Sequence, residues 1–215
     1  MVATRRQLHG IAESFIAGPQ YRATGTIRLA VRLDGFSATT LAIAVHATAL
    51  VVDDGSLALA GPVRELIQAS GLDVGPPVGA YDAVAALDPD AVLDLDADAA
   101  DAIYRCLYAG GFAINAVLPE GHPVLWPEHF DVAASADEVN YGVSAGDDFH
   151  PLPYAYVGPW DFATSPRTGP LWNAPFGAVR GLDLDADVDT LATEVTEFFR
   201  HGMDALHGGV AHRHG

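Results

Sequence analysis

Frequent chain-turning residues are the feature of this sequence that most limits its fold. The 215 residues include 22 Gly and 14 Pro, a load that implies many turns and that a helical bundle would not need. Half of the residues are hydrophobic, which is enough for most of the chain to fold around a sizeable core. Between the turn signals, some segments alternate apolar and polar residues and others repeat apolar residues at helical spacing. The sequence therefore predicts an α+β fold with antiparallel strands.

The periodic segments predict about four helices that flank antiparallel sheet. A capping box of Thr4 and Gln7 is expected to start the first helix, and Gly18-Pro19 to end it. The expected helices span residues 5–17, 62–70, 97–109 and 188–206, and the first strands span residues 26–33, 41–52 and 57–60.

These elements fit a single α+β domain over residues 1–206. A loop-like stretch with several Gly and Pro makes residues 72–92 the candidate internal seam. Each half contains strands with flanking helices, so a duplicated arrangement is one option. Residues 207–215 are rich in His and Gly and predict a flexible tail, which could bind a divalent metal or stay solvated.

The charge balance is strongly acidic. The formal net charge is −17, with 28 acidic residues against 11 basic ones, and all of the basic residues are Arg. A negative field opposes binding to nucleic acids and to anionic membrane surfaces, because both require basic residues. It also repels anionic ligands at long range unless an Arg cluster overrides it locally. We therefore expect no nucleic-acid or membrane partner, and a neutral or cationic small-molecule ligand.

Other sequence features favour a cytoplasmic protein. The stretch after Arg5 and Arg6 is too polar for a signal peptide, and no apolar run approaches the about 18 residues that span a membrane. The lone Cys106 excludes an intramolecular disulfide, and its helical surroundings predict a buried apolar residue.

Two aspartate-rich runs precede predicted helices, at residues 94–98 and 183–187. Their spacing suggests calcium loops, but the Gly that such a loop needs at its sixth position is replaced by Ala99 and Val188. Carboxylates at a helix N-terminus also satisfy free backbone amides and the helix dipole. We therefore interpret both runs as helix caps.

A predicted hairpin could carry a functional site. Residues 128–135 and 139–145 alternate as two strands joined by a turn at 136–138, with Ala134 opposite Val139. One face of this hairpin is apolar and predicts core. The other face is polar with small side chains, as in the floor of a pocket. It carries His129, Asp131, Ala133, Asn140, Gly142 and Ser144.

His129 and Asp131 are the candidate catalytic residues of this face. The carboxylate could orient the imidazole as a general base, or the two could share a metal ion with His150. Asn140, Ser144, Tyr154, Tyr156 and Trp160 are the candidate ligand-binding residues. The same pattern is also typical of a solvent-exposed sheet face, and the sequence identifies no cofactor.

A tyrosine-rich segment over residues 153–160 offers a different interpretation. Its aromatic residues share one strand face, where they could belong to the core or form a pocket wall, and its prolines suggest an edge strand. The alternative function is therefore a non-catalytic interaction domain that uses this strand for partner binding or homo-oligomerisation.

Residues 126–177 resemble a family of actinobacterial proteins without an assigned function. The resemblance rests on the segments Trp126–Asp131, Asn140–Asp147, Pro153–Trp160 and Trp172–Gly177, and it extends more weakly over nearly the whole chain. Ala145 departs from the proline expected between Ser144 and Gly146. The resemblance implies no activity, cofactor or catalytic residue.

Overall fold

The computed structural model describes residues 1–208, and residues 209–215 lie outside it. Its helical segments are α1 (Val2–Ile11), η1 (Ala12–Ala17), α2 (Gly18–Thr24), α3 (Val63–Ser70), α4 (Ala97–Val117) and α5 (Val188–Gly208). Its strands are β1 (Leu29–Arg32), β2 (Gly35–Ala38), β3 (Ile43–His46), β4 (Ala49–Val52), β5 (Gly55–Ala58), β6 (Ala60–Pro62), β7 (Val92–Asp94), β8 (Val124–Trp126), β9 (Asp131–Ala136), β10 (Val139–Ser144), β11 (Tyr154–Pro159) and β12 (Ala178–Gly181).

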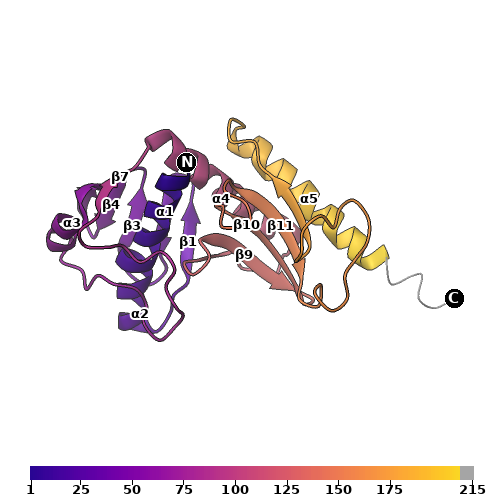
Figure 1. Cartoon of the computed structure of the whole chain (residues 1–215), viewed down its shortest axis with the longest axis horizontal. Helices are drawn as coiled ribbons and strands as arrows, with labels where there is room; N and C mark the ends of the chain where they lie inside the picture. The colour runs from indigo at the N-terminus through magenta and orange to yellow at the C-terminus, as the bar shows by residue number, and fades with distance from the viewer. Residues whose placement is uncertain (209–215) are drawn as a thin grey trace.

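One antiparallel sheet of ten strands runs through both halves of the chain, in the order β12-β11-β10-β9-β8-β1-β2-β3-β4-β5. Figure 1 shows the first half at one end of an elongated molecule and the second half at the other. Each half has the order helix, five-stranded meander, helix. The two meanders meet where β1 pairs with β8 through Leu29 and Leu125. The α+β class is confirmed.

Helix α4 forms the centre of the core. It packs against β1 and β2 of the first meander and against β9 and β10 of the second. The approach is close at Gly110, where a Cβ atom would lie 2.7 Å from Val143. Helix α5 packs beside α4 over β11, on the same side of the strands (Figure 1), and Phe199 meets Tyr141 at a ring distance of 5.7 Å.

The first helix differs from its prediction at both ends. It begins at Val2, so Thr4 and Gln7 do not form a capping box but instead accept the amides of Asp96 and Asp94. It also continues past Gly18-Pro19 to Thr24, because the π-helical segment η1 accommodates the proline.

The π-helical segment also provides a contact for another part of the chain. Within it, the Gly18 amide donates to the carbonyl of Glu13, five residues earlier. The Ser14 carbonyl accepts the amide of Gly75, and a Cβ atom at Gly18 would overlap the Gly75 carbonyl oxygen. The irregular segment 71–91 therefore lies directly on this helix.

Both aspartate runs act as helix caps, as predicted. Asp96 accepts the Ala99 amide at 3.0 Å, and Asp187 accepts the Thr190 amide at 2.8 Å. Helix α4 extends beyond the predicted residue 109, because Gly110 and Gly111 are helical positions that give close packing rather than an end. Cys106 is buried, which raises the pKa of its thiol to about 12.

Several predicted strands need correction. The predicted strand 41–52 is the hairpin of β3 and β4, which turns at Ala47 with φ +50°, and β2 was not predicted. β11 is not an edge strand, because β12 pairs with it on the outer side. Pro153 precedes β11, and Pro159 is its last residue, beyond the end of the β12 pairing at Val157.

The 129–144 hairpin forms with a different register. Val139 lies opposite Ala136 rather than Ala134, around a two-residue turn in which Asp137 and Glu138 both have positive φ. A shift of two residues keeps each side chain on its predicted face. However, β9 begins at Asp131, so His129 lies in the preceding turn and not on the strand.

The last helix extends further toward the C-terminus than predicted. His207 and Gly208 belong to α5 rather than to a tail, and the rest of the predicted tail lies outside the described residues. Within residues 1–208, none of the helices combines the length and the apolar character that crossing a membrane requires.

Candidate functional site

A cavity of about 940 Å³ lies where α1, the turn at 127–130 and the strands β9, β10 and β11 meet. We call it the Asp131 cavity. Its polar lining residues are Arg5, Arg6, His9, Glu128, His129, Asp131, Asn140, Ser144, Asp147 and Asp148, and its aromatic ones are Phe149, Tyr154, Tyr156, Trp160 and Phe176. Its volume lies in the range of small-molecule sites. All the predicted ligand-binding residues therefore border one cavity.

The floor of the cavity is built around Asp131 and Tyr156. The Tyr156 hydroxyl donates a hydrogen bond to Oδ2 of Asp131. Gly142 lies between their strands, and a Cβ atom there would be 2.5 Å from the Tyr156 hydroxyl oxygen. The glycine thus leaves the space through which the Tyr156 ring reaches Asp131.

Asp131 is a buried carboxyl group with a raised pKa. Its residue is 6% exposed, and its Oδ1 is buried without a hydrogen-bond partner among residues 1–208. Burial raises its pKa from 3.8 to about 6, although the Tyr156 hydrogen bond and the charge of His129 act in the opposite direction. Asp131 can therefore accept or release a proton near neutral pH, or hold a cationic group.

A second tyrosine–aspartate pair supports the aromatic wall. Tyr154 donates to Oδ2 of Asp147 at 2.6 Å, and Oδ1 of Asp147 accepts the amides of Phe149 and His150. Burial and this bond raise the pKa of Tyr154. Both carboxylate oxygens of Asp147 therefore accept hydrogen bonds from the protein, and these bonds order the loop that carries Phe149.

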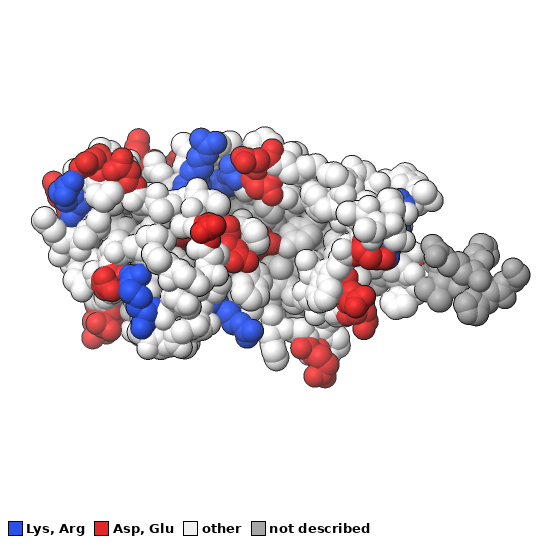
Figure 2. All heavy atoms as spheres, turned by 60° about the horizontal axis from the view of Figure 1, so that its bottom comes forward, with Lys and Arg blue, Asp and Glu red and all other residues white. Residues whose placement is uncertain are grey.

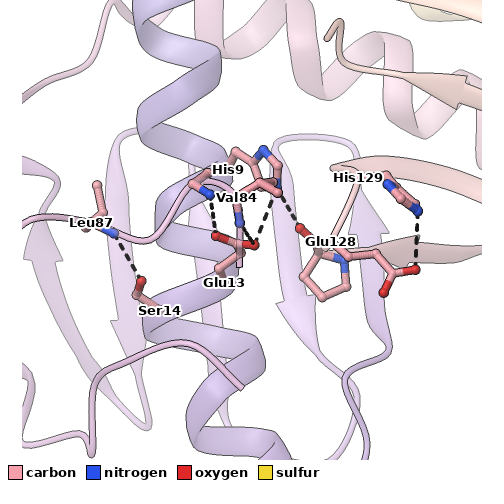
Figure 3. Close-up of polar contacts among 9 residues, drawn as sticks. His9, Glu13, Ser14, Val84, Leu87, Glu128 and His129 are labelled. Carbon is pink, nitrogen blue, oxygen red and sulfur yellow. Dashed lines mark hydrogen bonds and ion pairs between the residues drawn. The ribbon is translucent and has the colours of Figure 1, made fainter. Parts of the chain in front are cut away.

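His129 borders the cavity but is not bound to Asp131. Its side chain is 70% exposed, and its Nε2 lies 3.4 Å from Oε1 of the neighbouring Glu128 (Figure 3). Asp131 instead binds Tyr156. The two predicted catalytic residues therefore share a cavity without forming a hydrogen-bonded pair.

A three-ligand metal site is not formed within residues 1–208, where no three His, Cys, Asp or Glu side chains are grouped closely enough. His150, the third candidate ligand, instead has its Nδ1 at 2.9 Å from the carbonyl of Leu152.

Asn140, Ser144 and Trp160 are held by contacts within the protein. The Asn140 carbonyl oxygen accepts the Trp160 indole N–H at 2.8 Å, which fixes the tryptophan at the cavity rim. The buried Ser144 hydroxyl accepts the Gly146 amide at 3.0 Å. Ser144 therefore orders the loop after β10.

Helix α1 contributes residues that the sequence analysis did not identify. Arg5 is 8% exposed and donates through Nη1 to the carbonyl of Gly146, while Arg6 is exposed at the same cavity. A signal was present in the sequence, because Arg5 falls on the apolar stripe of the helix, three residues before Leu8. A charged residue on a buried stripe marks a special environment.

His9 closes the cavity near the turn at 127–130. Its ring stacks on Phe130 at 5.4 Å, and Nε2 lies 2.7 Å from the carbonyl of Pro127, so it is the nitrogen that donates (Figure 3). Burial lowers the pKa of His9 to about 4, so the ring is neutral.

A buried glutamate holds another wall of the cavity. Glu13 accepts the amides of Val84 at 3.2 Å and Ala85 at 2.8 Å, and Ser14 accepts the amide of Leu87 (Figure 3). Burial raises the pKa of Glu13 despite these donors. Residues 84–86 line the cavity, so the π-helical segment positions this wall.

Charged side chains of both signs are interspersed on one face of the molecule (Figure 2). On the face drawn in Figure 2, the basic side chains form small separate groups, with acidic groups between them.

Comparison with known proteins does not identify the site: no protein-family model, curated protein or solved structure matches this chain.

Proposed function

We propose that this protein binds a small molecule in the Asp131 cavity, and that Asp131 anchors it. The observation that carries this proposal is the buried Oδ1 of Asp131, which has no partner within residues 1–208. Leaving a buried acceptor unsatisfied costs about 1–3 kcal/mol. A ligand that donates a hydrogen bond or carries a cationic group would remove this cost.

The surroundings of Asp131 support a ligand with an apolar part. Tyr156 and Tyr154 lie with their rings 6.3 Å apart, and Phe176 meets the Tyr156 ring at 6.5 Å. Such a wall binds flat or apolar groups, while a few polar atoms fix the orientation. The acidic balance of the chain also favours a cationic or neutral ligand over a simple anion.

A thermal-shift screen with a library of amines, alcohols, amides and acids tests the proposal. A ligand present at one hundred times its Kd stabilises the native state by about 2.7 kcal/mol, which corresponds to a rise in Tm of about 5–10 °C in a chain of this size. Asp131→Asn keeps an acceptor for Tyr156 but removes the charge, so we expect affinity to fall about 10–100-fold.

The matched control is Asp148→Asn, which removes the same charge from an exposed residue at the same cavity. Affinity should change less than threefold in this variant. The proposal fails if no compound stabilises the wild type, or if the two variants weaken binding equally.

The alternative function is an interaction domain that uses the aromatic strand. Trp160, 63% exposed at the end of β11, and the exposed Phe149 favour it. The tyrosines of the strand do not, because Tyr154 is buried and Tyr156 is turned toward Asp131. A dimer in sedimentation velocity that Trp160→Ala abolishes would favour this alternative over the ligand site.

A further inference from the structure

Two adjacent arginines at the Asp131 cavity have no acidic partner. Arg22, Arg64 and Arg105 each form an ion pair elsewhere on the molecule. Among residues 1–208, no carboxylate oxygen lies within ion-pair distance of Arg5 or Arg6. The two arginines bring positive charge to a cavity that is also lined by the acidic residues Glu128, Asp131, Asp147 and Asp148.

The protein orients the guanidinium of Arg5 but accepts hydrogen bonds from only some of its N–H groups. Its Nη1 donates to the carbonyl of Gly146, whereas its Nε is buried without a partner among the described residues. Nε and Nη2 form one edge of the guanidinium, and two parallel N–H donors on one edge match the two oxygens of a carboxylate. Arg5 thus holds this edge at the wall of the cavity, where Nε is covered by the surrounding atoms.

Asp131 provides the opposite charge in the same cavity. Its buried Oδ1 lacks a donor, just as Arg5 Nε lacks an acceptor. No ion pair joins the two residues, so they do not satisfy one another. Buried polar atoms without partners are rare in native proteins, and two of opposite kind at one cavity indicate a ligand that supplies both counterparts.

We infer that the ligand is a small zwitterion of the amino-acid class with an apolar side chain. Its carboxylate binds the free edge of Arg5, with Arg6 at the mouth, and its ammonium group binds Asp131. Its side chain packs against Tyr154, Tyr156 and Phe176. This inference rests on the proposed function, to which it adds the carboxylate site and the ligand class.

Calorimetry with three probes that share a phenyl ring tests the inference. L-phenylalanine carries both charges, 2-phenylethylamine carries only the ammonium group, and 3-phenylpropanoate carries only the carboxylate. We expect L-phenylalanine, or another apolar amino acid among the twenty, to bind at least about tenfold more tightly than its matched amine and acid, because each missing ion contact costs about 1.5–3 kcal/mol.

Arg5→Lys provides a second measurement that keeps the charge but removes the two-donor edge. It should weaken the zwitterion and the acid about tenfold and leave the amine unchanged. Arg32→Lys, on an exposed residue of β1 that does not line the cavity, is the matched control and should change none of the three affinities.

The outcomes separate this inference from the proposed function. If the amine binds as tightly as the amino acid, the carboxylate site is wrong while Asp131 remains the anchor. If a library compound binds through Asp131 but none of the twenty amino acids does, the ligand class alone is wrong. If the acid binds as tightly as the amino acid, or if no compound of any class binds, both proposals are overturned.

Discussion

At the scale of single residues, Asp131 couples the function of the site to the stability of the fold. A raised pKa means that the native state holds this proton more tightly than the unfolded chain, in which the pKa is near 3.8. The contribution of Asp131 to stability is therefore greatest below about pH 4, decreases as the pH rises to about 6, and stays at its lowest value above that. A shift of about two pKa units corresponds to about 3 kcal/mol.

Asp131→Asn should consequently stabilise the protein at neutral pH. We expect the free energy of unfolding at pH 7.5 to rise by about 1–2 kcal/mol, less than the full amount, because the new amide is itself buried without a partner. Between pH 4 and 6 the difference between variant and wild type should shrink or reverse. Urea unfolding at several pH values measures this, with Asp148→Asn as the control. A variant that is less stable at pH 7.5 would contradict the assignment of a raised pKa.

The sequence placed the polar face correctly but not the histidine. Alternation along residues 128–135 predicts that His129 lies beside Asp131 on one strand. This prediction is wrong because Phe130 adopts φ +50°, so the strand begins only at Asp131. Residues other than Gly rarely adopt this conformation, so no local rule anticipates it. Arg5 and His9 were missed for another reason: their partners, Gly146 and Pro127, lie 141 and 118 residues away in the chain.

At the scale of elements, the π-helical segment connects the first helix to the wall at residues 84–87. The carboxylate of Glu13 is the acceptor for the part-buried amides of Val84 and Ala85, and π-type turns within helices frequently occur at functional sites. The apolar spacing predicted the buried face of this helix correctly, since Leu8, Ile11 and Phe15 are buried. It could not reveal that the helix continues through Pro19, because that depends on the Gly75 amide from a distant loop.

Glu13→Ala should release this wall locally. The part-buried amides of Val84 and Ala85 would lose their acceptor, and a hydrogen bond of this kind contributes about 1–3 kcal/mol. We expect hydrogen exchange at Val84 and Ala85 to become about 10–100-fold faster, while exchange in α5 changes with global stability only. Ser14→Ala, which removes the longer 3.4 Å contact to Leu87, is the control and should leave the amides of Val84 and Ala85 protected. Unchanged exchange at Ala85 in Glu13→Ala would show that other contacts hold the loop.

At the scale of the whole molecule, the two halves repeat one order of elements but share one core. Only one residue pair joins the meanders at the sheet, so the junction depends on α4. At Gly111 an added Cβ atom would lie 2.9 Å from Val31 of the first half and 3.8 Å from Val132 of the second. The predicted seam at 72–92 stays a prediction, because the position of a loop does not determine how independently two halves unfold.

The packing of α4 leads us to expect one cooperative unfolding transition. Differential scanning calorimetry should give a calorimetric enthalpy equal to the van't Hoff enthalpy. Gly111→Ala, which overpacks the junction, should cost about 1–3 kcal/mol and lower the single Tm by about 2–10 °C without splitting the peak. Gly181→Ala is the matched control, since a Cβ atom there meets no neighbour within 4 Å. If Gly111→Ala instead shifts only one of two resolved transitions, each half folds around its own helices, and the cavity between α1 and β9–β11 would be an interface between two domains.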